Sequence, residues 1–241
     1  MVLDPTWTEG PKDLRTETAV NAGRESELER LLSIRVPDLV AYQDEPYAAR
    51  YREFVERVAR RESELGLGSD LAEAVARYLY KLMAYKDEYE VARLSLEPGF
   101  DAMVKDAVGE GAKLSWRLHP PALRAMGLKK KLSLGAWFKP VFRLLRWARR
   151  LRGTALDPFG RDAIRKLERE LIVEYRELIE RELGTLSAAT HGRAVALAKL
   201  PDMVRGYEGV KRKNVERYRL AIAATLTPAP VSERAAVPVA G

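Results

Sequence analysis

Two histidines and a few carboxylate clusters are the side chains in this sequence that could serve as metal ligands or as general acids and bases. His119 stands before two prolines, and His191 lies near the start of an expected helix. A zinc site is built from clustered His, Cys or carboxylate ligands, and the sequence places no such cluster around either histidine. We therefore interpret both as turn or packing residues.

The carboxylates gather at Asp87, Glu88 and Glu90, and again at Asp44 and Glu45. A catalytic acid–base pair requires burial and a shared cleft that separates the two pKa values. On helices this rich in charge, a solvated face or an ion pair is the expected use of such residues. The sequence also lacks a glycine-rich phosphate loop and a nucleophile elbow.

The chain contains no cysteine. This excludes disulfides, a thiolate-ligated iron–sulfur cluster and a cysteine nucleophile within these residues. We therefore expect this chain to have no active site and to bind no metal or cofactor itself.

The feature that stands out is a basic segment, residues 111–156, which contains twelve Lys and Arg residues and no Asp or Glu. The net charge of the whole chain is +7, so the remaining residues are mildly acidic. Aromatic side chains are interleaved with these cations: Trp116, Trp137, Phe138, Phe142 and Trp147. Such a segment could bind nucleic acid, an anionic membrane surface or an acidic patch of a protein. Alternatively, the aromatics are core and the cations pair with neighbouring acidic helices. We weigh this last interpretation equally with protein docking, and nucleic acid or membrane below both.

The 241 residues, 46% of them hydrophobic and 32% charged, are enough for a domain with a real core and amphipathic helices. No apolar run approaches the ~20 residues of a membrane span, so we expect a cytoplasmic protein. Residues 1–24 are expected to form a flexible arm, 25–224 a single helical domain and 225–241 a flexible tail.

Apolar spacing and capping residues predict a mainly α fold with at most one small β-hairpin near 113–134. A capping box at Ser26 and Glu29 opens a first helix that should end before Pro37. The other helices are expected over about 46–65, 69–94, 140–151, 157–184, 187–200 and 208–224. Ser69 and Asp157 are the predicted N-caps of two of them.

Five stretches, taken in order, resemble the C-terminal region of indolepyruvate:ferredoxin oxidoreductases and related long-chain 2-oxoacid:ferredoxin oxidoreductases. They are VPDLVAYQDEPYAARYREFVERV (36–58), YLYKLMAYKDEYEVARL (78–94), KLSWRLHPP (113–121), RLRGTALDPFGRDAIRKLER (150–169) and AVALAKLPDMVRGYEGVKRKNVE (194–216). Each stretch alone is weak, but five in the right order and spacing are fairly specific. The resemblance covers residues 26–220.

The resemblance implies a reaction in which an aryl 2-oxoacid is oxidatively decarboxylated to its acyl-CoA, with thiamine diphosphate and iron–sulfur clusters as cofactors. The residues for that work lie upstream in the family's longer chains, so the cofactors are expected in partner subunits. The resemblance therefore implies a non-catalytic accessory or scaffold subunit that binds the catalytic subunits and, through its cations, acidic ferredoxin. The candidate docking residues are Lys129, Lys130, Lys131, Arg143, Arg146, Arg149 and Arg150. The alternative function is a basic helical module that binds nucleic acid; we expect no membrane partner.

Overall fold

A computed structural model describes residues 26–97, 99, 116–118, 132–134, 136–206 and 208–227, and these residues form a mainly α fold, as the sequence predicts. The helices are α1 (Glu27–Tyr42), α2 (Glu45–Glu64), α3 (Asp70–Met83), α4 (Glu88–Ser95), α7 (Lys139–Trp147), α8 (Ala163–Gly184), α9 (Ala188–Lys199) and α10 (Glu208–Leu226). Three 3-10 helices, η1 (Ala136–Phe138), η2 (Ala148–Leu151) and η3 (Leu200–Met203), extend or join them.

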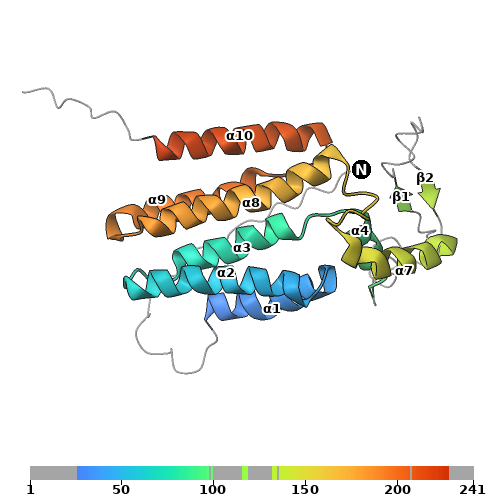
Figure 1. Cartoon of the computed structure of the whole chain (residues 1–241), viewed down its shortest axis with the longest axis horizontal. Coiled ribbons are helices and arrows are strands. Elements are labelled where there is room, and N and C mark those ends of the chain that lie inside the picture. Colours follow the sequence, from blue (N-terminus) through green and yellow to red (C-terminus); the bar gives the residue numbers. More distant parts are fainter. Residues whose placement is uncertain are drawn as a thin grey trace, which may run out of the picture.

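Most of the helices stack side by side in one layered bundle (Figure 1), which we call the main bundle. It consists of α1, α2, α3, α8, α9 and α10, and α3 lies at its centre, in contact with α1, α2, α8 and α9. The central position follows from the sequence of α3, which has buried side chains on most of its circumference, including Leu71, Val75 and Leu79. The tyrosines Tyr51, Tyr175 and Tyr218 extend the same core into the neighbouring helices.

A smaller group of elements lies at one end of the main bundle (Figure 1), and we call it the lateral lobe. It consists of α4, η1, α7 and η2, with α7 packed on α4. Next to it, strand β1 (Trp116–Leu118) pairs antiparallel with β2 (Leu132–Leu134), with Trp116 opposite Leu134. Both strands lie within the range 113–134 that was predicted for a small hairpin.

The first predicted helix boundary is wrong, because α1 continues through Pro37 to Tyr42. Proline has no N–H and its ring crowds the preceding turn, so it disfavours a helix interior by about 3 kcal/mol. The continued helix buries Leu39 and Tyr42 completely, which is worth roughly 1.5–3 kcal/mol for each side chain. Burial on the far side of Pro37 therefore outweighs the lost hydrogen bond.

The helix predicted over 69–94 is two helices, α3 and α4, which are separated at residues 84–87. Asp87 begins the second one: its carboxylate accepts a hydrogen bond from the backbone N–H of Glu90, 2.8 Å away. The expected solvated face is also wrong here, since Asp87 and Glu90 are buried. Both form ion pairs with arginines, which is the other role that the sequence allowed.

The N-cap of α3 comes from a distant residue and not from Ser69, which makes no capping bond. The fully buried carboxylate of Glu62, on α2, accepts hydrogen bonds from the N–H groups of Leu71 and Ala72 at 2.8 and 2.9 Å. The same carboxylate lies 2.6 Å from Nε2 of His191. His191 therefore contacts the carboxylate that caps α3.

Asp157 is not the N-cap of α8, which begins six residues later with Asp162 as its cap. Asp157 is buried in the preceding turn instead, where it accepts hydrogen bonds from the N–H groups of Gly153 and Phe159 and from the hydroxyl of Tyr89. These hydrogen bonds stabilise the turn that connects the lateral lobe to the main bundle.

The last helix, expected to end at Ala224, continues to Leu226, two residues into the expected tail. The N-terminal arm, the rest of the tail, His119 and Lys129–Lys131 lie outside the described residues.

Candidate docking surface

Helix α7 presents most of its apolar side chains to solvent. Its helical spacing predicts an amphipathic helix with a stripe of Val141, Leu144, Leu145, Ala148 and Leu151. In the structure the buried residue of α7 is Phe142, while Leu144 is 62% exposed. The helix therefore packs on α4 through Phe142 and leaves Val141 and Leu144 exposed, while Leu145, Ala148 and Leu151 are half-buried.

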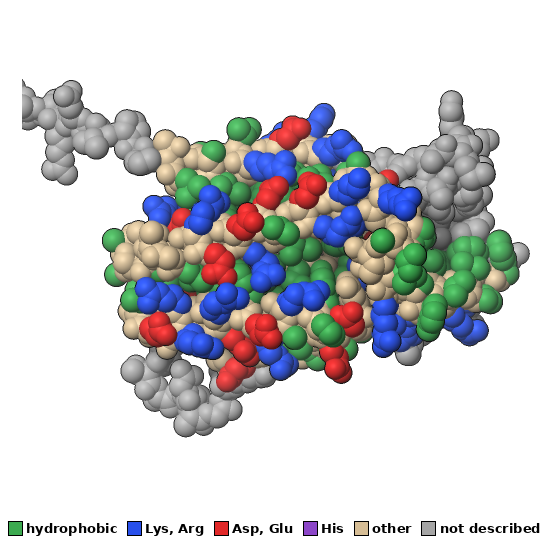
Figure 2. Space-filling view, in the orientation of Figure 1, with side chains coloured by type: hydrophobic (Ala, Val, Ile, Leu, Met, Phe, Trp, Pro, Cys, Tyr) green, Lys and Arg blue, Asp and Glu red, His purple; other side chains and the backbone are tan. Residues whose placement is uncertain are grey.

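Tryptophans extend this stripe at both ends of α7. Trp137 in η1 is 70% exposed and Trp147 is 74% exposed, although tryptophan is a side chain that proteins usually bury in large part. Figure 2 shows hydrophobic side chains gathered over α7 at that end of the molecule. We call Trp137, Val141, Leu144 and Trp147 the α7 face.

Several arginines next to the α7 face have no acidic partner among the described residues. Arg143, Arg146 and Arg150 are exposed, and none of them forms an ion pair within the part of the chain that the structure describes. Arg149 is half-buried; its Nη1 donates to the backbone oxygen of Arg146, but its Nε has no hydrogen-bond partner. Burial, together with the positive charges of Arg150 and Arg146, lowers the pKa of the Arg149 guanidinium.

Arg152 is the exception among these cations, and it anchors the lateral lobe to the main bundle. Its Nε and Nη2 donate to the carboxylate of Asp87 at 2.5 and 2.9 Å, and its Nη1 donates to the backbone oxygen of Tyr42 at 2.6 Å. The guanidinium also stacks on the Tyr42 ring, 3.6 Å from its centroid. Burial alone would lower the pKa of Arg152, but the hydrogen bonds and charge of Asp87 outweigh it and raise the pKa.

A second arginine joins α4 to the main bundle. Arg93 makes two hydrogen bonds to the carboxylate of Glu90, at 2.8 and 2.7 Å, and one to Asp38 of α1 at 3.0 Å. The lobe that carries α7 is therefore fixed by two buried, charge-assisted networks. These bonds fix the lobe that carries the α7 face to the main bundle.

The structure describes four of the seven candidate docking residues. They are Arg143, Arg146, Arg149 and Arg150, and the structure brings these four together beside exposed aromatic rings. Of the aromatics whose side chains are described, Phe142 is buried in the core and Phe138 is half-buried. Trp137 and Trp147 are exposed. The anchoring role of Arg152 was not predicted, and its place in a stretch without acidic residues is the signal in the sequence that points to it.

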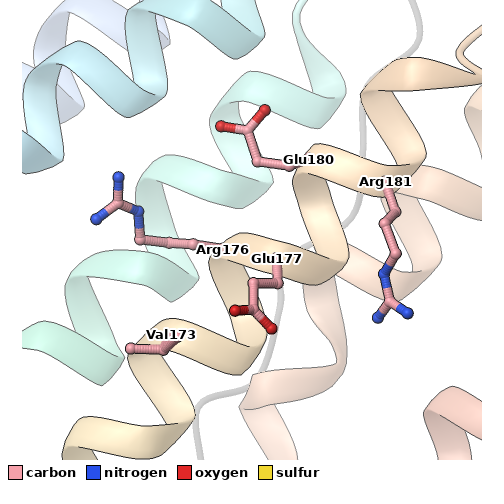
Figure 3. Close-up of a pocket in the computed structure, with 5 residues that line it drawn as sticks. All are labelled: Val173, Arg176, Glu177, Glu180 and Arg181. Carbon is pink, nitrogen blue, oxygen red and sulfur yellow. The ribbon is translucent and has the colours of Figure 1, made fainter.

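A hollow on α8 lacks the converging polar groups that a catalytic site requires. This open hollow of about 560 Å³ is lined by Val173, Arg176, Glu177, Glu180 and Arg181. Figure 3 shows these five side chains leaving α8 in different directions, so their polar groups do not converge on one point. Among the described residues, no group of three or more His, Asp or Glu residues could hold a metal ion.

None of the described helices combines the length and the apolar composition needed to cross a bilayer.

Comparison with known proteins identifies a family without an assigned function. The sequence model of a family of unknown function (DUF6537) matches residues 28–224, which is most of the chain. No curated protein and no solved structure matches the chain.

Proposed function

The chain belongs to the family of unknown function DUF6537, and we propose that it is a non-catalytic accessory subunit or module of an indolepyruvate-type 2-oxoacid:ferredoxin oxidoreductase complex in the cytoplasm. The observation that carries this proposal is the α7 face, a set of exposed apolar side chains beside arginines that have no acidic partner among the described residues. The choice of complex rests on the resemblance of the five sequence stretches to that enzyme family.

The composition of the α7 face supports docking to a protein. Clusters of exposed apolar side chains on soluble proteins mark interaction sites. Trp and Arg are the residue types most enriched among side chains that dominate binding energy, and both occur here. Covering Leu144 and the two tryptophans removes apolar surface worth roughly 1.5–3 kcal/mol for each side chain, before the costs of association.

In the proposed complex, this chain positions the other subunits, and the catalytic subunits carry out the reaction. Thiamine diphosphate would carry the acyl group, and iron–sulfur clusters would pass electrons to ferredoxin, all bound to the catalytic subunits. Because this chain has no cysteine, the cluster ligands must come from those subunits. Ferredoxin is a further proposed partner, since unpaired arginines attract acidic proteins and accelerate their encounter.

The proposal is tested by affinity purification of the tagged chain from its native host, with the bound proteins identified by mass spectrometry. We expect thiamine-diphosphate and iron–sulfur subunits of a 2-oxoacid oxidoreductase to co-purify with the wild type. The Leu144→Ala/Trp147→Ala variant should recover much less of them. Leu220→Ala serves as a control, because Leu220 on α10 is 70% exposed and far from α7 in sequence. A chain that elutes without any oxidoreductase subunit refutes the proposal.

A further inference from the structure

We propose that the α7 face is the seat of an acidic amphipathic helix from a partner protein, whose apolar side covers Leu144 and Trp147 and whose carboxylates pair with Arg143, Arg146 and Arg150. This inference rests on the proposed function, since it specifies the partner surface that docks on the α7 face. The charge, the shape and the residue types of the face support it.

The charge of the face selects an acidic partner. Residues 136–156 contain six cations and no Asp or Glu, and of the arginines among them Arg152 alone is paired with a carboxylate in the described structure. The half-buried Arg149, whose Nε has no partner, adds a charge that neighbouring arginines already disfavour. A second copy of the chain would bring the same positive charges to the interface, so self-association through this face is opposed by repulsion.

The shape of the face selects a helix. Val141 and Leu144 lie one helical turn apart, and Trp147 follows after a further turn, so the uncovered side chains form a ridge along α7. Nine residues of α-helix make a rod of about 13 Å. A ridge of this kind packs into the groove of a second helix, and helix pairing is a recurring way to recognise an amphipathic segment.

The residue types favour protein over the two other polyanions. Nucleic acid stacks its bases on aromatic rings, which would leave the aliphatic Val141 and Leu144 uncovered. Binding to lipid scales with the apolar area inserted, and α7, tethered by Phe142, offers a single short ridge. Arginine forms two parallel hydrogen bonds with a carboxylate, and five of the six cations in residues 136–156 are arginines.

The test uses the full chain and a fluorescein-labelled, designed peptide of about 18 residues, or roughly five helical turns, with Leu on one face and Glu on the other. Fluorescence anisotropy at low salt measures its affinity, and a copy with Lys in place of Glu is the charge control. We expect the Glu peptide to bind and the Lys peptide not to bind. Leu144→Ala/Trp147→Ala and, separately, Arg143→Glu/Arg146→Glu/Arg150→Glu should each weaken binding by about tenfold or more.

Matched variants on α10 separate this effect from nonspecific attraction. Leu220→Ala and Arg212→Glu change an exposed leucine and an exposed arginine of that helix, and they should leave the affinity within about twofold of the wild type. The Arg-to-Glu triple variant should differ from the wild type less at high salt, because exposed charges are screened.

Two results overturn the inference. One is no binding of the Glu peptide; the other is tighter binding, through the same residues, to phosphatidylserine vesicles or to random-sequence duplex DNA. Either result leaves open the recovery of oxidoreductase subunits from the host, so the inference and the proposed function can fail separately. Likewise, if the Glu peptide binds but no oxidoreductase subunits co-purify, the α7 face remains a binding site for an acidic helix and the proposed oxidoreductase complex is rejected.

Discussion

Replacing Arg152 with methionine would remove the positive partner of a carboxylate that is almost completely shielded from solvent. The side chains of Arg152 and Asp87 are 2% and 3% exposed, so solvent screening gives little relief. Breaking a buried pair by removing one partner costs about 3–5 kcal/mol of unfolding free energy. Asp87 would keep its hydrogen bond from the N–H of Glu90 at the start of α4, so we expect a loss near the lower end, about 3 kcal/mol.

Urea unfolding followed by far-UV circular dichroism measures this loss. Arg205→Met is the matched control, because Arg205 pairs with Asp202 at 2.6 Å while its side chain is 68% exposed. That surface pair should contribute about 0–1 kcal/mol. The double variant Asp87→Asn/Arg152→Met leaves no unpaired charge and should be more stable than Arg152→Met alone. A loss for Arg152→Met no larger than that for Arg205→Met would refute the assignment of Arg152 as the buried anchor of the lateral lobe.

Two further predictions concern the main bundle. Glu62→Ala should lower the unfolding free energy by about 2–4 kcal/mol, because two backbone N–H groups of α3 and the ring of His191 lose their hydrogen-bond partner. The control Ser69→Ala should change the unfolding free energy by less than about 0.5 kcal/mol. Equal urea midpoints for these two variants would contradict the assignment of Glu62 as the cap. Nine of the ten tyrosines have a pKa above the ordinary value of a phenol, chiefly because they are buried. Burial raises the pKa of Tyr51 and the pKa of Tyr85 to about 12. A phenol with a folded pKa above its unfolded value of about 10 stabilises the fold fully below pH 10, and this contribution is lost between about pH 10 and 12. Tyrosinate absorbance should therefore rise together with loss of the helical circular dichroism signal; gradual ionisation near pH 10 with the helices intact would count against it.

Local signals in the sequence were sufficient for most of the main bundle. The stripe of Tyr51, Phe54 and Val58 on α2, and that of Leu171, Tyr175 and Leu178 on α8, are buried as their spacing predicts. These stripes are set by the 3.6-residue period, and burial of a whole face dominates the energetics of each helix.

The errors arose where distant residues decide the local structure. The break between α3 and α4 depends on Asp87, and its carboxylate is held by Arg152, which follows 65 positions later. Likewise, the cap of α3 comes from Glu62 on the preceding helix, and the continuation of α1 past Pro37 depends on the burial of Tyr42 beneath Arg152. No local pattern encodes these partners.

The α7 face illustrates a different limit. An apolar stripe in a sequence shows that a surface requires covering, but it does not show whether the cover belongs to the same chain. The stripe predicted along this helix leaves Leu144 exposed, and α7 buries Phe142 instead. The candidate arginines were found by composition, and the reason to expect a partner came only from the exposure of the residues between them.

Hydrogen exchange of the full chain, measured with and without the purified catalytic subunits of a 2-oxoacid:ferredoxin oxidoreductase, tests the docking role of α7 most directly. We predict that the subunits slow exchange in residues 139–151, with little change in α10. Slowed exchange elsewhere with 139–151 unchanged, or no change anywhere in the chain, would contradict docking through the α7 face.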